Sequence, residues 1–171
     1  MSLGALKNDL FIERIGSSIG KHCKRMGIHI NFAPVVDINT NPKNPIIGNR
    51  SYGESKFNVA RKAVSFTKGL QSEGILACAK HFPGHGDTSI DSHLQLPVIR
   101  ASRERLNRVE LLPFQRAIQA GVRAIMTSHL VVPALERQQD VPATLSKRIS
   151  TSLLREELGF KGLVFTDAMN M

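Results

Sequence analysis

Four short apolar runs, separated by stretches with helical spacing, constrain the fold of this chain more than any other feature. The runs cover residues 28–38, 75–82, 122–132 and 162–169. Near-continuous apolar character of this kind is typical of strands that are buried on both faces of a parallel sheet. Since parallel strands are joined by crossover helices, the alternation predicts an α/β fold in which helices cover the sheet.

The stretches between the runs predict amphipathic helices, because their apolar residues recur at steps of three to five positions. The expected helices lie near residues 10–26, 59–70, 106–118 and 150–158. Ser102 is a plausible N-cap for the third region, and Pro113 is expected to divide that region into two helices. Ser150 is expected to cap the last helix.

Polar side chains that could act in binding or catalysis follow the carboxyl end of each expected strand. They are Asp37, Lys80 with His81, Ser128 with His129, and Asp167. In parallel α/β folds the carboxyl ends of the strands form one rim, and sites are built there. A long polar segment at residues 39–53 follows the first strand, and loops of this length are often functional. The sequence therefore predicts a functional site on this rim.

The end of the chain indicates an incomplete domain. Asp167 stands at the tip of the last expected strand, and no helix follows it. Four strands also do not close a β-barrel. We therefore expect residues 1–171 to be a single, incomplete segment of a larger β/α domain, in which residues 1–3 could be an expression scar.

Composition limits the classes of partner. The formal net charge of +9 suggests an anionic partner, but the basic residues are scattered, and one Tyr and no Trp are present for base stacking. We therefore expect no nucleic-acid interface. No apolar run approaches the roughly 20 residues of a membrane span, and the N-terminus lacks the pattern of a signal peptide. We expect no membrane contact and favour a cytoplasmic location, with an exported parent protein as the alternative.

Residues 80–93 read KHFPGHGDTSIDSH, and three interpretations of this stretch compete. The first is a metal site, but His81, His85 and His93 are separated by four and eight residues, without HExxH or a cysteine pair at zinc spacing. The second is a phosphate site, because two glycines follow a strand, but GxxxxGK[ST] is absent. We expect no metal ion or other cofactor, and a metal-dependent hydrolase stays as an alternative.

Asp91 and His93 support the third interpretation, which is proton transfer. A carboxylate near an imidazole fixes its tautomer and favours the imidazolium. Such a pair suits a histidine that acts first as a general acid and then as a base near neutral pH. Asp167 adds a carboxylate on the same rim. An acid/base group and a carboxylate on either side of one bond are what glycoside hydrolysis requires.

Four longer stretches carry a resemblance to a known family. They are NFAPVVDINTNPKNPIIGNRSYGES, KHFPGHGDTSIDSH, AIMTSHLVVPAL and SLLREELGFKGLVFTDAMNM. Together they resemble, in the same order, bacterial family 3 glycoside hydrolases of the β-N-acetylglucosaminidase type, the NagZ-like enzymes. The resemblance covers nearly the whole chain. It implies a partial (β/α)8 TIM-type barrel with about four β/α units, the third to sixth strands of the family barrel.

The resemblance implies a retaining mechanism with three catalytic positions. Asp167, in FTDAM, matches the nucleophile that forms a covalent glycosyl-enzyme. His93 matches the unusual histidine acid/base of this subfamily, and Asp91 matches its dyad partner. His93 would first protonate the leaving oxygen and later activate water. Ordinary β-glucosidases of the superfamily generally lack the D-S-H loop, so its presence favours the N-acetylhexosaminidase branch.

The resemblance also implies a carbohydrate substrate and the residues that bind it. Arg50, Lys80 and His81 match positions that hold the hydroxyls of the terminal sugar. The implied substrate is a terminal β-linked GlcNAc, as in peptidoglycan muropeptides. The first two and last two strands of the family barrel are not recognisable, so open sheet edges predict association with another copy. The alternative to an enzyme is a structural or binding remnant of the same fold that lacks turnover.

Overall fold

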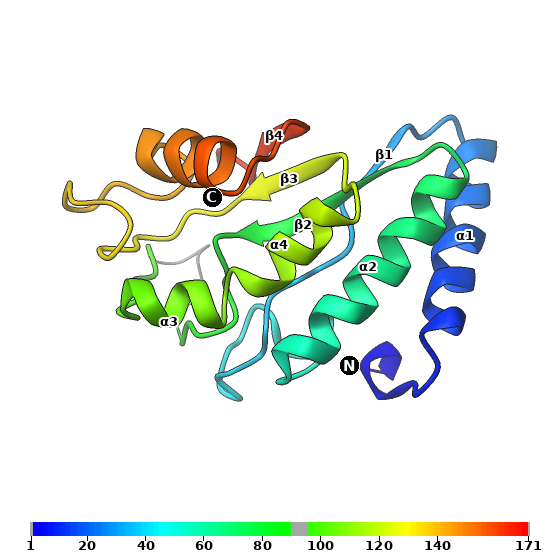
Figure 1. The fold of residues 1–171 in the computed structure, drawn as a ribbon, viewed down its shortest axis with the longest axis horizontal. Helices are drawn as coiled ribbons and strands as arrows, with labels where there is room; N and C mark the ends of the chain where they lie inside the picture. Colours follow the sequence, from blue (N-terminus) through cyan, green and yellow to red (C-terminus); the bar gives the residue numbers. More distant parts are fainter. Residues whose placement is uncertain (1, 90–95, 171) are drawn as a thin grey trace.

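The structure is a computed structural model that describes residues 2–89 and 96–170 of the chain. Within these residues, four strands form one parallel sheet in the order β1-β2-β3-β4, so each strand pairs with the next strand along the chain. The arrowheads of β2 and β3 point the same way in Figure 1. The elements in chain order are η1 (Ser2–Ala5), α1 (Asp9–Arg25), β1 (Ile30–Asn31), η2 (Gly48–Arg50), α2 (Lys56–Ser72), β2 (Leu76–Phe82), α3 (Arg103–Arg108), α4 (Leu112–Gln119), β3 (Ala124–Thr127), η3 (Arg148–Glu157) and β4 (Leu163–Thr166).

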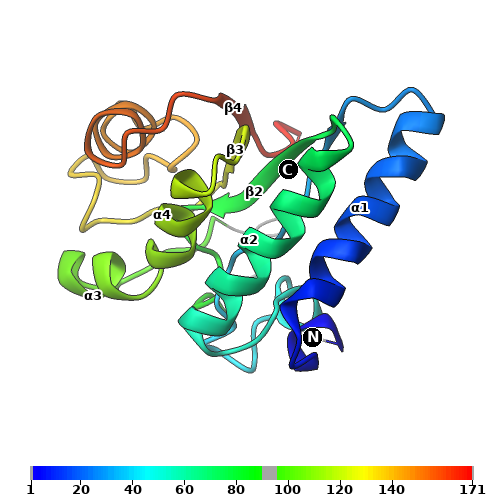
Figure 2. The ribbon, with the colours of Figure 1, turned by 45° about the vertical axis from the view of Figure 1, so that its right-hand side comes forward.

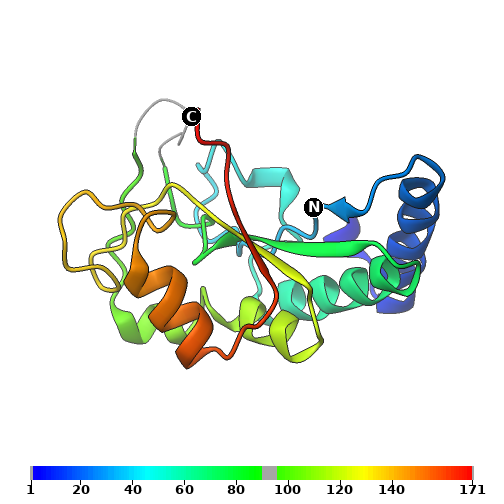
Figure 3. The ribbon, with the colours of Figure 1, turned by 90° about the horizontal axis from the view of Figure 1, so that it is seen from above.

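The sheet is curled, with the helices on its outer side. Figure 3 shows α2, α4 and η3 on one side of the strands, and Figure 2 shows α1 alongside α2. On the other side, the ring of Phe32, directly after β1, contacts the ring of Phe165 in β4, with 5.3 Å between the ring centroids. Because β1 and β4 are the two edge strands and side chains stand roughly perpendicular to a sheet, this contact requires a curled sheet. The predicted α/β fold, part of a TIM-type barrel, is confirmed.

The regular strands are shorter than the apolar runs that predicted them. The first run contains only the two-residue β1, since Pro34 has no N–H and interrupts the ladder. The chain beyond β1 still follows β2: Lys80 N donates to Pro34 O at 3.1 Å, and Val36 N donates to Lys80 O at 2.7 Å. This irregular pairing places Asp37 beside the end of β2, where it meets His81.

Side-chain caps and a proline set the ends of the helices near the site. Ser102 Oγ accepts from a backbone N–H in the first turn of α3, and Pro113 lies in the first turn of α4, as the sequence predicts. The prediction for Ser150 is wrong, because η3, a π-helix, begins before it and Ser146 Oγ accepts from Ile149 N. The Ser150 hydroxyl instead donates to Ser146 O within the helix. None of the helices in the described ranges is long and apolar enough to cross a membrane.

Two apolar clusters occupy the two sides of the sheet. The larger cluster packs the helices against the strands, and the smaller one lies on the concave side. The concave cluster consists of Cys78, Ala124 and Met126, with the half-buried Phe165 against them. Burial raises the pKa of the Cys78 thiol to about 12, so this cysteine stays protonated at neutral pH.

Candidate active site

The carboxyl ends of the strands form a rim that carries the candidate site. Asp37 follows the extension of β1, Lys80 and His81 end β2, and Asp167 follows β4. Backbone hydrogen bonds continue the parallel pairing past β3 and β4, since Asp167 N donates to Thr127 O at 3.0 Å. The rim therefore presents its polar side chains from neighbouring strands, as the sequence predicts.

A β-bulge at His81 separates the two polar residues at the end of β2. Lys80 pairs with Met126 and Phe82 with Thr127, so His81 is an extra residue in the register. A bulge of this kind re-aims a side chain and is common beside active sites. Lys80 and His81 consequently meet different partners although they are neighbours in sequence.

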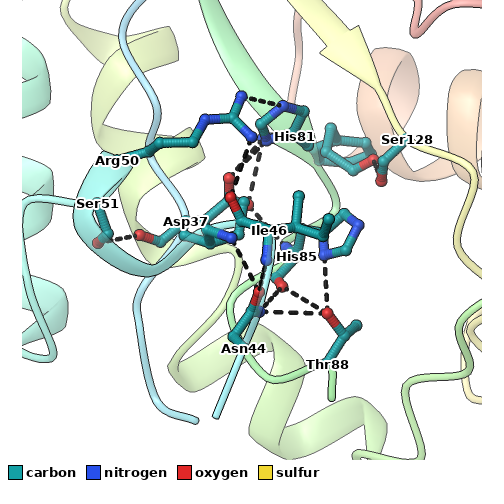
Figure 4. A network of polar contacts seen from close by, with 11 residues as sticks. Asp37, Asn44, Ile46, Arg50, Ser51, His81, His85, Thr88 and Ser128 are labelled. Atoms are coloured by element: carbon teal, nitrogen blue, oxygen red, sulfur yellow. Dashed lines mark hydrogen bonds and ion pairs between the residues drawn. The ribbon is translucent and has the colours of Figure 1, made fainter. Parts of the chain in front are cut away.

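The buried carboxylate of Asp37 anchors both histidines of the KHFPGH segment (Figure 4). His81 N lies 3.2 and 3.1 Å from its two oxygens, and His81 Nδ1 lies 2.7 Å from Oδ2. His85 N donates to Oδ1 at 2.7 Å. Burial raises the pKa of Asp37, but the charges and hydrogen bonds of His81 and His85 outweigh burial, so this pKa lies below its ordinary value.

Arg50 approaches His81 from the long polar loop. Its Nη2 lies 3.4 Å from His81 Nε2, and its Nη1 donates to Ile46 O at 3.2 Å. The next residue, Ser51, donates its hydroxyl to Asp37 O at 2.7 Å. Arg50 and His81, which lie 31 residues apart in the sequence, are therefore brought together by the fold.

Asn44 joins this polar loop to the glycine-rich loop after β2. Its Oδ1 accepts from Ile46 N and Ile47 N, at 2.9 and 2.8 Å. Its Nδ2 donates to His85 O at 2.8 Å and to Thr88 Oγ1 at 3.2 Å. Because Asn44 is buried and uses both ends of its amide, it holds the two loops at a fixed separation.

His85 is a buried member of the same network. Its Nδ1 lies 2.9 Å from Thr88 Oγ1, and its ring meets that of His81 edge to face, with 6.0 Å between centroids. Burial lowers the pKa of His85, although the charge of Asp37 opposes this shift. His85 Nε2 has no hydrogen-bond partner among the residues that the structure describes.

Asp87 ties the glycine-rich loop to α3. Arg105 lies 3.1 Å from Asp87 and 3.2 Å from Glu110, and the Thr40 hydroxyl donates to Asp87 at 3.0 Å. Burial raises the pKa of Glu110, and the nearby Arg105 opposes this rise. The loop that begins at His81 is thus held by carboxylates at both ends, Asp37 and Asp87.

Lys80 and Asp167 are the rim charges with the fewest partners. Lys80 is half-buried, and no hydrogen bond or ion pair joins its ammonium to any other described residue. Burial lowers the pKa of Lys80, as does the charge of Arg50, and the charge of Asp167 opposes them. Asp167 Oδ1 accepts from Ala168 N at 2.9 Å. Within the described residues, most of the hydrogen-bonding capacity of these two groups is therefore unused.

The structure places some of the predicted site residues and leaves others untested. Arg50, His81 and Lys80 lie on the rim with Asp167, whereas Asp91 and His93 lie outside the described residues. In the described ranges, no group of three or more His, Cys, Asp or Glu side chains is arranged to hold a metal ion. Sequence reasoning missed the anchoring roles of three residues, Asp37, Asn44 and Thr88. The position of Asp37 at a strand end was the only signal that could have found one of them.

Comparison with known proteins identifies the family to which this architecture belongs. The model of the glycosyl hydrolase family 3 N-terminal domain matches residues 1–171. A family 3 β-N-acetylglucosaminidase structure from Paenibacillus sp. superposes with a TM-score of 0.98 and 48% identity, covering 100% of this chain and 32% of that chain.

Two further proteins are similar to this chain. β-Hexosaminidase A of Pseudoalteromonas piscicida is 42% identical over 100% of this chain and 31% of its own length. The structure of NagZ from Neisseria gonorrhoeae in complex with N-trifluoroacetyl-D-glucosamine superposes with a TM-score of 0.88 and 35% identity, covering 95% of this chain and 47% of that chain. The chain thus spans about a third to a half of the length of the proteins it matches.

Proposed function

Because this chain belongs to glycosyl hydrolase family 3, we propose that it is part of the catalytic domain of a retaining β-N-acetylglucosaminidase. The proposed reaction is exo-hydrolysis of a terminal β-linked GlcNAc, with peptidoglycan muropeptides as the natural source. Support comes from the relatives named β-hexosaminidase and from the neighbour solved with a GlcNAc derivative. We propose that residues 1–171 form one structural unit within a larger (β/α)8 barrel.

One observation supports this function most. A lysine with few hydrogen-bond partners, Lys80, lies on the same rim as a carboxylate, Asp167. Lys80 and Asp167 are close enough for their charges to interact, and the residues that the structure describes do not saturate either group with hydrogen bonds. A saccharide offers hydroxyls, which accept from Lys80, and an anomeric carbon, which a carboxylate can attack. Arg50 and His81 supply further contacts for hydroxyls on the same side.

In the proposed mechanism, Asp167 attacks the anomeric carbon as His93 protonates the leaving oxygen. The glycosidic bond breaks, and an ester bond forms between the sugar and Asp167. His93 then takes a proton from water, which attacks the same carbon and releases Asp167. Asp91 is proposed to hold the imidazole of His93 in the required tautomer.

The test is turnover of a chromogenic β-GlcNAc glycoside by the polypeptide as encoded, over its full length. Asp167→Asn should reduce turnover to the background rate because the nucleophile is removed. Asp140→Asn is the matched control, since Asp140 is exposed in the loop between β3 and η3 and has no assigned role, so turnover should be unchanged. Retained activity in the Asp167 variant would contradict the nucleophile assignment.

The role of His93 is tested by the dependence on the leaving group. His93→Ala should slow substrates with poor leaving groups by about 10²–10⁴-fold and good ones much less, because proton donation matters most for poor leaving groups. Equal losses for both substrates would contradict the acid assignment. Loss of wild-type activity on adding a chelator would instead favour a metal-dependent hydrolase, and absence of turnover would favour a non-catalytic remnant.

We also propose that this chain, taken by itself, associates with a second copy. Phe32 and Leu163 are 48% and 49% exposed, and they belong to the two edges of the sheet. Exposed apolar side chains beside unpaired strand edges favour association with another sheet. Sedimentation at micromolar concentration should show a dimer or larger species, and a monodisperse monomer would contradict this proposal.

A further inference from the structure

We infer that Asp37 is a positioning residue that holds His81 in the Nδ1–H tautomer, so that His81 Nε2 accepts a proton-bearing hydroxyl of the ligand. The tautomer follows from the contacts of Asp37, His81 and Arg50 alone. The statement about the ligand rests on the proposed function. Its consequence is that His81 would be a hydrogen-bond acceptor on a rim where Arg50 and Lys80 can only donate.

The first step concerns Nδ1 of His81. The Asp37 side chain is wholly buried, and its oxygens receive two backbone N–H groups as well as the ring nitrogen. An ionised carboxylate only accepts hydrogen bonds, so the ring nitrogen at 2.7 Å must carry the proton. The lowered pKa of Asp37 is consistent with a carboxylate that stays ionised in this environment.

The second step concerns the other ring nitrogen. His81 Nε2 faces Arg50 Nη2 at 3.4 Å, and a guanidinium has donors but no acceptor. A proton on Nε2 would point at another N–H, so the contact requires a lone pair there. In the neutral form of His81, the ring proton is therefore on Nδ1 and the lone pair is on Nε2.

The third step explains why the ring keeps this orientation. The backbone N–H of His81 is bound to the same carboxylate as its side chain, so main chain and ring are held by one group. A flipped ring would turn a C–H toward Asp37 and leave a buried carboxylate oxygen without its shortest ring contact. His81 is 3% exposed, which leaves little space for other rotamers.

A ligand hydroxyl is the group that matches this rim. An incoming hydroxyl can take the single Nε2 lone pair from Arg50 Nη2, whose contact at 3.4 Å is long, and can accept from Arg50 or Lys80 in return. Since a fluorine cannot donate to Nε2, the rim selects for a free hydroxyl at this position over a fluorinated or alkylated one.

Nitrogen-15 NMR of the histidine rings tests the tautomer without any need for turnover. In the ¹⁵N-labelled protein, with His81 assigned by the signal lost in His81→Gln, we expect a protonated Nδ1 and an unprotonated Nε2. Arg50→Ala should keep this tautomer, because Asp37 sets it. Asp37→Asn, where folded, should populate the Nε2–H form. A protonated Nε2 in the wild type, or a tautomer that changes in Arg50→Ala, would overturn the inference.

Substrate analogues test the consequence for the ligand. Replacing the matching hydroxyl with fluorine should lower kcat/KM about tenfold in the full-length wild type, and this difference should vanish in His81→Phe. If no hydroxyl shows such coupling to His81, the acceptor role is wrong. A protein with no turnover but the expected ring signals would instead overturn the proposed function and leave the tautomer intact.

Discussion

Two aspartates stand at opposite ends of the strand rim, Asp37 beside β2 and Asp167 after β4. The side chain of Asp37 is wholly buried and its oxygens are occupied by His81 and His85. Asp167 is half-buried, and its side chain accepts from the N–H of the next residue. A saturated carboxylate orients its neighbours, whereas one with unused lone pairs can react. The same residue type thus takes a positioning role at one end and is suited to a chemical role at the other.

The largest expected effect compares the stability cost of removing each aspartate. Asp37→Ala should lower the free energy of unfolding by about 3–5 kcal/mol, because it leaves buried donors without an acceptor. Asp167→Ala should change this free energy by no more than about 0.5 kcal/mol, as expected for a side chain with few partners. Urea denaturation of both variants measures the difference. Similar losses would break the distinction between the two ends.

The second prediction concerns acid. The pKa of Asp37 is lowered in the folded protein, so the unfolded chain binds a proton first as the pH falls. The stabilisation is therefore present above the ordinary value of 3.8 and is lost as the pH falls from 3.8 through the lower folded pKa. The unfolding free energy of the wild type should drop over this range relative to that of Asp37→Asn. Parallel pH profiles for the two proteins would contradict it.

The smallest expected effect concerns the ring contact between Phe32 and Phe165, which joins the two edges of the sheet. Phe32 and Phe165 meet across the concave side, so Phe32→Leu and Phe165→Leu should be coupled by about 0.5–1.5 kcal/mol in a double-mutant cycle of unfolding free energies. Phe57→Leu serves as the control, because Phe57 is exposed on α2 and should combine additively with Phe165→Leu. Additive behaviour of the first pair would show that the curl does not depend on this contact.

Periodic features of the fold could be predicted from the sequence, but contacts between distant segments could not. Apolar runs and the Ser102 cap are local signals, and the parallel sheet and α3 agree with them. The apolar run at 28–38 is longer than the strand within it, because the run keeps its apolar character where Pro34 breaks the ladder. Ser150 was misassigned because Ser146, four residues earlier, is held by Glu136 and receives the helix N–H first.

In the candidate site, too, residues in a local motif could be predicted, whereas roles that depend on distant contacts could not. Arg50, Lys80 and His81 were predicted because they match family positions, and the structure places all three on the rim. The roles of Asp37 and Asn44 depend on hydrogen bonds that span 41 to 48 residues of chain, and no spacing rule reports such contacts. The roles of these two side chains follow only from the partners that the fold brings to them.

The aromatic contact between Phe32 and Phe165 lies in an apolar layer directly below the rim. Cys78 lies two residues before Lys80 and Phe165 two residues before Asp167, and the ring of Phe32 lies against Phe165. The layer directly beneath Lys80 and Asp167 is therefore apolar and offers no hydrogen bonds to a polar solute. A polar ligand at Asp167 is expected to make its hydrogen bonds with the side chains of the rim and to find only van der Waals contacts beneath them.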